Sequence, residues 1–115
     1  MSRLEVETQE IPLGYLISLR GELDVSTADR LAQEVVRAEK RHPKLLVIDL
    51  RELAFVDSSG LRVIVAADVA ARREDRRVVI VEGSEEVRRV FRYTLLDRRL
   101  NLVEDPEEVE GYPEG

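Results

Sequence analysis

Two short apolar runs joined by a helical segment constrain the fold of this chain most. The first lies in KLLVIDL, residues 44–50, and the second lies in RRVVIVEG, residues 76–83. Uninterrupted runs of this kind are typical of strands that are covered on both faces in a parallel sheet. Residues 61–71 between them are apolar almost all round, which predicts a helix that lies deep or is covered on two sides. A helical crossover makes the two strands parallel neighbours.

The N-terminal part of the chain adds a hairpin and a further helix. Residues 4–8 and 14–20 alternate between polar and apolar side chains, which predicts an antiparallel pair of strands. In residues 26–42, apolar side chains recur at the spacing of one helix face. Ser26 and Asp29 resemble a capping box at the start of this helix, which we expect to end at His42 and the proline that follows.

The C-terminal part of the chain adds a third helix and a last strand. Ser84 opens the third helix, whose expected inner face consists of Val87, Val90, Phe91 and Leu95. Residues 100–104, LNLVE, predict a short strand, and residues 106–110 predict one helical turn. The order of elements is therefore ββαβαβαβ. We predict a single α/β domain with a mixed central sheet and helices packed on it.

The net charge of −6 is concentrated at the C-terminal end. Residues 103–115 contain six acidic side chains and no Lys or Arg, and removing those six from 24 leaves 18 acids against 18 basic residues elsewhere. We therefore expect a folded domain over residues 1–104 and an acidic tail, solvated and partly disordered, over residues 105–115. An acidic tail disfavours direct binding to nucleic acid or to an anionic membrane surface.

The sequence lacks the residues that several classes of function require. There is no cysteine and a single histidine, and neither a phosphate-binding loop nor a nucleophile elbow occurs. Glu22, Asp24 and Asp57 could collect a magnesium ion as in a receiver domain, but no adjacent acidic pair ends the first strand. We expect no enzyme activity, no cofactor and no metal. Since no apolar stretch approaches about 20 residues and no signal peptide opens the chain, we expect a cytoplasmic protein without a membrane partner.

The stretch LAFVDSSGL, residues 53–61, places polar residues at the entry to the second helix. Asp57, Ser58 and Ser59 are all suitable N-cap residues, and Gly60 allows close packing, so a helix cap explains the stretch by itself. Only one cap is needed, however, and a phosphoryl group on a first-turn serine would meet the positive end of the helix dipole. Its added charge of about −1.5 to −2 could repel a bound partner. The spacing alone does not decide between a helix cap and a phosphorylation site. It also does not decide whether Ser58 or Ser59 would accept the phosphate.

Three motifs carry a resemblance to a known family. GELD at residues 21–24, VIDL at 47–50 and FVDSSGL at 55–61 occur in an order and spacing that resemble the STAS domain, and most closely the bacterial anti-sigma-factor antagonists. The resemblance covers residues 4–104. It implies a non-catalytic switch that binds an anti-sigma factor with serine kinase activity and so releases a sigma factor. It also implies that the kinase ends binding by phosphorylating Ser58, and that a metal-dependent serine phosphatase resets the protein.

The resemblance also assigns roles to the residues around Ser58. It implies that Asp24 and Asp57 lie near the acceptor serine, and that Ser59 and Gly60 form the turn that presents it. Gly60 and Leu61 would shape the surface that contacts the partner.

This sequence departs from the family pattern at Arg62, where many antagonists have a small residue. An arginine there could pair with the phosphate or favour a particular partner. Two other functions stay open, namely a STAS scaffold in a stress-signalling assembly and a STAS protein that binds a nucleotide or small molecule. The intact Asp57-Ser58-Ser59-Gly60 favours the antagonist, whereas the absence of a glycine-rich phosphate cradle weakens the nucleotide-binding alternative.

Overall fold

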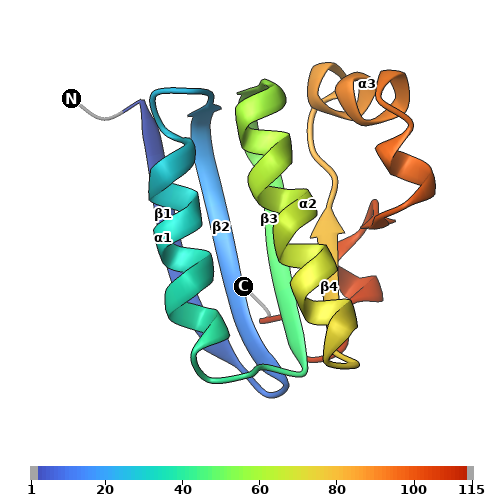
Figure 1. Cartoon of the computed structure of the whole chain (residues 1–115). Coiled ribbons are helices and arrows are strands. Elements are labelled where there is room, and N and C mark those ends of the chain that lie inside the picture. Colours follow the sequence, from blue (N-terminus) through green and yellow to red (C-terminus); the bar gives the residue numbers. More distant parts are fainter. Residues whose placement is uncertain (1–2, 114–115) are drawn as a thin grey trace.

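The computed structural model describes residues 3–113 as one mixed sheet with helices packed on it (Figure 1). The five strands lie in sequence order, β1-β2-β3-β4-β5. The first pair is antiparallel and the other neighbours are parallel, as predicted from the alternating and continuous apolar runs. The strands are β1 Leu4–Ile11, β2 Gly14–Leu23, β3 Leu45–Val56, β4 Arg77–Val81 and β5 Asn101–Val103.

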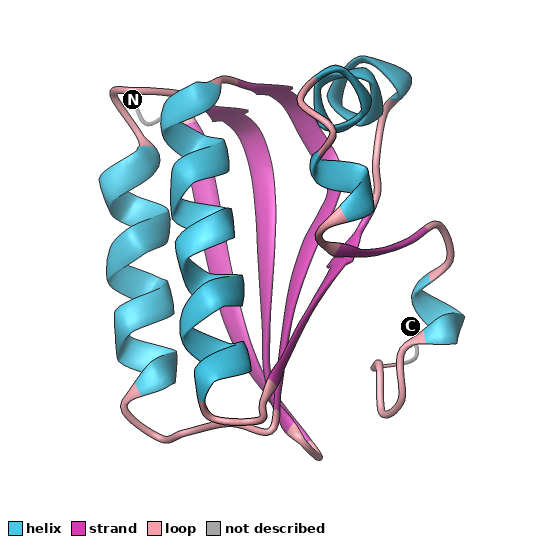
Figure 2. Cartoon of the chain, turned by 45° about the vertical axis from the view of Figure 1, so that its right-hand side comes forward, coloured by secondary structure: helices cyan, strands magenta, loops and turns pink. Residues whose placement is uncertain are grey.

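Helices α1 and α2 lie side by side on one face of the sheet, and α3 packs near the end of β3 (Figures 1 and 2). Their bounds are α1 Ala28–Glu39, α2 Ser58–Arg73 and α3 Glu85–Tyr93, and two 3-10 turns follow, η1 Leu96–Arg98 and η2 Pro106–Glu108. The predicted order ββαβαβαβ is confirmed. Among the described residues, no helix combines the length and the apolar character needed to span a membrane.

The first half of strand β3, residues 45–50, is buried on both faces, which explains its continuous apolar run. Leu46 and Ile48 face the main core between the sheet and the helices. Leu45 and Val47 face a second, smaller core on the opposite side of the sheet. Because side chains alternate between the two faces of a strand, one apolar run contributes residues to both cores.

The predicted capping box at Ser26 is wrong. Helix α1 begins at Ala28 behind Thr27, whose side chain makes no cap hydrogen bond. Ser26 therefore lies one residue before the N-cap position, and its hydroxyl donates a charge-assisted hydrogen bond to Oδ1 of Asp24 at 2.6 Å. At its other end the helix stops at Glu39, before His42, which adopts a φ of 49° and places Nδ1 3.2 Å from Oε1 of Glu74.

Two expectations about the C-terminal part also differ from the structure. Val87 and Phe91 are buried and Val90 is partly buried, but Leu95 lies beyond the end of α3 and is 54% exposed. The expectation of a solvated tail does not hold for Val109, which is 6% exposed, or for Tyr112, which packs against the second core. Partial disorder of the tail stays a prediction, and residues 114–115 lie outside the described residues. These two apolar side chains dock although their acidic neighbours stay in solvent.

Candidate functional site

The candidate site lies where two parallel strands end at the same edge of the sheet. Strand β2 ends at Leu23, which is in register with Val56 at the end of β3. The loop of residues 24–27 after β2 is therefore next to the start of α2 (Figure 1). In open α/β sheets, this edge is where functional groups gather.

Asp57 is the N-cap of α2. Its Oδ1 accepts hydrogen bonds from the backbone N–H groups of Ser59 at 2.9 Å and Gly60 at 3.2 Å. Its Oδ2 accepts a third from the N–H of Val25 at 3.1 Å. One carboxylate thus caps the helix and ties the loop after β2 to the helix start.

Ser58 is the first residue of α2, and its side chain is exposed, whereas Ser59 is only partly exposed. Across residues 3–113, neither serine hydroxyl makes a hydrogen bond, because Asp57 alone supplies the cap. The Ser58 hydroxyl therefore lies exposed at a helix start that Asp57 fixes, and it takes no part in the cap.

Gly60 and Leu61 support the site from beneath. A Cβ placed on Gly60 would lie 2.5 Å from Cγ of Leu23 and 3.2 Å from Cγ2 of Val56, so only glycine lets α2 start this close to the two strand ends. Leu61 is 6% exposed and belongs to the main core. Both residues are buried, and they shape the surface only by positioning the helix.

Asp24 organises the loop after β2. It is buried, and its carboxylate accepts hydrogen bonds from the Ser26 hydroxyl at 2.6 Å and the Ser26 N–H at 2.9 Å, and it pairs with the Arg3 guanidinium. The Ser26 hydroxyl above all, followed by the Ser26 N–H and then by the charge of Arg3, holds the pKa of Asp24 below its ordinary value, although burial opposes this. The loop is thereby fixed in shape.

Arg62 lies one turn after Ser58 on the exposed side of α2. Within the part of the chain that the structure describes, its guanidinium forms no ion pair or hydrogen bond. It is available to a group that approaches the start of the helix.

Two exposed apolar residues that lie beside the site were not identified from the sequence. Val25 is 78% exposed, because Asp24 and Asp57 hold its loop from both sides. Phe55 is 48% exposed although it stands in an apolar run. The pairing of β2 with β3 is irregular near this end, and Leu53 and Val56 both face the main core, which leaves Phe55 outside it. Leu53 and Val56 are three residues apart, whereas side chains on one face of a regular strand are two residues apart. This apolar spacing was the available signal in the sequence.

The acidic residues near the site do not form a metal-binding arrangement. Among residues 3–113, no group of three or more His, Cys, Asp or Glu side chains is placed to hold a metal ion. Asp24 is instead engaged by Arg3 and Ser26, and Asp57 by backbone N–H groups.

A comparison with known families identifies the class. The STAS domain family matches residues 5–109, and the chain belongs to that family. Its relatives include the anti-sigma-B factor antagonist of Staphylococcus aureus strain NCTC 8325, which is 26% identical over 104 residues, covering 90% of this chain and 96% of that protein.

Solved structures show the same fold. An anti-sigma factor antagonist from Mycobacterium paratuberculosis superposes with a TM-score of 0.84 at 26% identity, over 91% of this chain and 89% of that one. The phosphorylated form of the Bacillus cell fate determinant SpoIIAA superposes with a TM-score of 0.70 at 19% identity, over 90% and 96% of the two chains.

Proposed function

We propose that this STAS domain is an anti-sigma-factor antagonist switched by phosphorylation of Ser58. The unphosphorylated protein binds an anti-sigma factor that is also a serine kinase, which frees a sigma factor in the cytoplasm. The observation that carries the proposal is the exposed Ser58 hydroxyl, held on a rigid helix start that Asp57 already caps. The 26% identity to proteins named anti-sigma factor antagonists supports it. The role is regulatory rather than catalytic.

The chemical step takes place on this chain, but the kinase supplies its reagents. Oγ of Ser58 attacks the γ-phosphorus of ATP bound to the kinase, the new O–P bond forms, and the bond from that phosphorus to the bridging oxygen breaks to release ADP. The hydroxyl proton passes to a base on the kinase. Because the Asp57 carboxylate already accepts three N–H groups, we assign it to positioning rather than to proton transfer.

The phosphate changes binding without a need to unfold the domain. At an exposed first-turn position, the helix dipole favours a negative group by about 0.3–1 kcal/mol. The phosphate adds a charge of about −1.5 to −2 next to Asp57. A hundredfold loss of affinity requires only about 2.8 kcal/mol. Like charges brought together at an interface supply an energy of that size.

The surface around Ser58 also contains side chains suited to a protein partner. Val25 and Phe55 are exposed apolar groups beside the cap. Arg62 lies on α2, and its guanidinium has no ion pair or hydrogen bond to any of residues 3–113. Aromatic side chains and arginines are enriched at protein interfaces, which favours Phe55 and Arg62 as the main contacts. We assign Val25 and Phe55 to partner contact, together with Arg62, while Asp24, Ser59, Gly60 and Leu61 hold the shape of the site. A serine phosphatase restores the hydroxyl.

The proposal is tested by mapping phosphate after incubation with the cognate kinase and ATP. We expect one phosphate, on Ser58, in the wild type and in Ser59→Ala, and none in Ser58→Ala. Phosphate on Ser59 alone contradicts the assignment of the acceptor. No phosphate on either serine, with the partner still bound, favours a scaffold role.

A further inference from the structure

The acidic segment that follows β5 lies on the side of the sheet opposite to α1 and α2 (Figure 2), where Val109 packs in the second core. We refer to residues 105–113 as the strap. We propose that the strap is a cover for the second core, and that it opens as one unit while the rest of the domain stays folded.

One side chain of the strap belongs to the second core. Val109 is 6% exposed and packs with apolar side chains of β1 to β4. The strip beneath the strap consists of Ile11, Leu16, Leu45, Val47, Val79 and Val81, none of which is more than 8% exposed. Because an apolar strip of this kind is unfavourable in water, covering it stabilises the closed strap.

A polar latch holds the end of the strap. The Tyr112 hydroxyl donates a hydrogen bond to Oδ2 of Asp49 at 2.5 Å and accepts one from Nη2 of Arg51 at 3.0 Å. The Arg51 guanidinium also lies 5.6 Å from the centre of the Tyr112 ring, within the range of a cation–π contact. Two residues of β3 that are two positions apart, Asp49 and Arg51, thus bind one side chain of the strap.

Opening the latch leaves no buried charge without a partner. Asp49 is 7% exposed, and it also accepts from the Arg51 backbone N–H at 2.9 Å and pairs with the Arg51 guanidinium at 3.0 Å. These bonds stay when Tyr112 leaves. The large cost of exposing an unpaired buried charge therefore does not oppose opening.

The strap is also separate from the sheet in its backbone hydrogen bonds. The N–H groups of Glu108, Val109 and Tyr112 donate to carbonyl oxygens within the strap, and Asp105 and Glu108 form a capping box. Throughout residues 3–113, no backbone hydrogen bond joins the strap to a strand. Only side-chain contacts must break for the strap to leave, as in units that open locally before global unfolding.

Thiol labelling of the full-length chain tests the proposal, since the sequence contains no cysteine. Three single variants are compared under native conditions: Val109→Cys in the strap, Val25→Cys at a position that is 78% exposed, and Val78→Cys at a main-core position that is 1% exposed. We expect the Val109→Cys thiol to react more slowly than the Val25→Cys thiol, yet at least 100-fold faster than the Val78→Cys thiol.

The latch is tested in the same assay by adding Tyr112→Phe to Val109→Cys. We expect a rise of about tenfold in the labelling rate, equivalent to about 1.4 kcal/mol. The matched control is Tyr93→Phe, which removes the hydroxyl of a tyrosine that is 80% exposed and should leave the rate unchanged. Equal rates for Val109→Cys and Val78→Cys would show that the strap leaves only on global unfolding. A Val109→Cys thiol as reactive as that of Val25→Cys, or insensitive to Tyr112→Phe, also overturns the proposal.

Discussion

Asp57 is the residue on which the geometry of the site depends most. It accepts hydrogen bonds from the N–H groups of Ser59, Gly60 and Val25. Replacing an N-cap residue by alanine costs about 0.5–2 kcal/mol. We expect Asp57→Ala to lower the free energy of unfolding by an amount near the upper end of that range, because the Val25 N–H also loses its acceptor. Urea denaturation measures the change.

Asp57→Asn is the matched control, because asparagine keeps a carbonyl acceptor and is itself a good N-cap. It should retain most of the stability. Equal losses in Asp57→Ala and Asp57→Asn would show that the charge, rather than the cap geometry, matters.

Gly60 gives a second prediction at the level of one residue. In a helix interior, alanine is favoured over glycine by up to about 1 kcal/mol. At position 60, however, the added methyl group would meet Cγ of Leu23 at 2.5 Å. Overpacking of a core typically costs about 1–3 kcal/mol, so we expect Gly60→Ala to be destabilising in thermal unfolding. A stabilised Gly60→Ala would contradict the close approach of α2 to the strand end.

The hydrogen bonds of Tyr112 should make the closing of the strap depend on pH. Burial, together with the hydrogen bond to Asp49, raises the pKa of Tyr112 to about 12. A folded-state pKa above the ordinary value of about 10 means that the contribution of this group is complete below pH 10 and is lost as the pH rises towards 12. The stability of the wild type should therefore fall more steeply than that of Tyr112→Phe between pH 10 and 12. Parallel curves of unfolding free energy against pH would contradict this role.

Asp49, the acidic partner of Tyr112, has a contribution to stability with the opposite dependence on pH. Burial raises the pKa of Asp49, but hydrogen bonds from Arg51 and Tyr112 outweigh it and hold the pKa below its ordinary value. The contribution of Asp49 is thus complete above its unfolded-state pKa and is lost as the pH falls through the folded-state value.

Elements with a clear apolar period were predictable from the sequence, and elements held by a few specific contacts were not. The runs at residues 45–48 and 78–81 predicted buried parallel strands because their burial on two faces leaves no polar position. The docking of the strap depends on the burial of Val109 and the hydrogen bonds of Tyr112, inside a segment whose composition indicates a solvated end. No local pattern specifies which side chain a tyrosine hydroxyl will find across the sheet.

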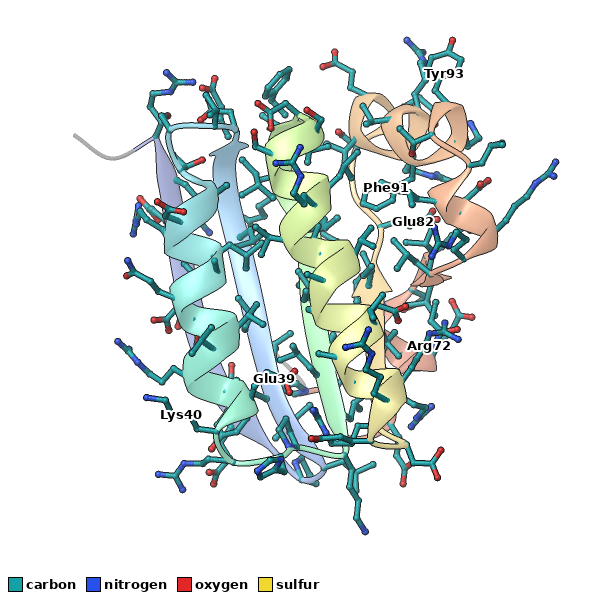
Figure 3. The ribbon with its side chains drawn as sticks, in the orientation of Figure 1. Glu39, Lys40, Arg72, Glu82, Phe91 and Tyr93 are labelled. Atoms are coloured by element: carbon teal, nitrogen blue, oxygen red, sulfur yellow. The ribbon has the colours of Figure 1, made fainter. Side chains whose placement is uncertain are left out.

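At the scale of the whole molecule, the exposed large apolar side chains are informative. Val25 and Phe55 flank the start of α2, and Tyr93 lies on α3 at the same end of the molecule (Figure 3). The motif FVDSSGL located this end from the sequence, but the exposure of Phe55 depends on the irregular pairing of β2 with β3. The motif therefore indicated where the proposed acceptor lies, but it did not indicate which side chains around it are exposed.

That surface gives a prediction for binding. We expect Phe55→Ala to weaken binding to the anti-sigma factor at least tenfold, about 1.4 kcal/mol, because an apolar anchor is lost. The control is Val36→Ala on α1, which removes an apolar side chain that is 56% exposed and lies away from the start of α2. Isothermal titration calorimetry measures both. An equal effect of the two substitutions would show that the partner does not dock around Ser58.

The central claim is that one phosphate on Ser58 controls partner binding, and the dissociation constant for the anti-sigma factor tests it most directly. It should be measured for the unphosphorylated protein, the protein phosphorylated on Ser58, and Ser58→Ala. We predict tight and equal binding for the unphosphorylated protein and Ser58→Ala, and at least a hundredfold weaker binding after phosphorylation, equivalent to about 2.8 kcal/mol. Equal affinities for the phosphorylated and unphosphorylated proteins would contradict the account.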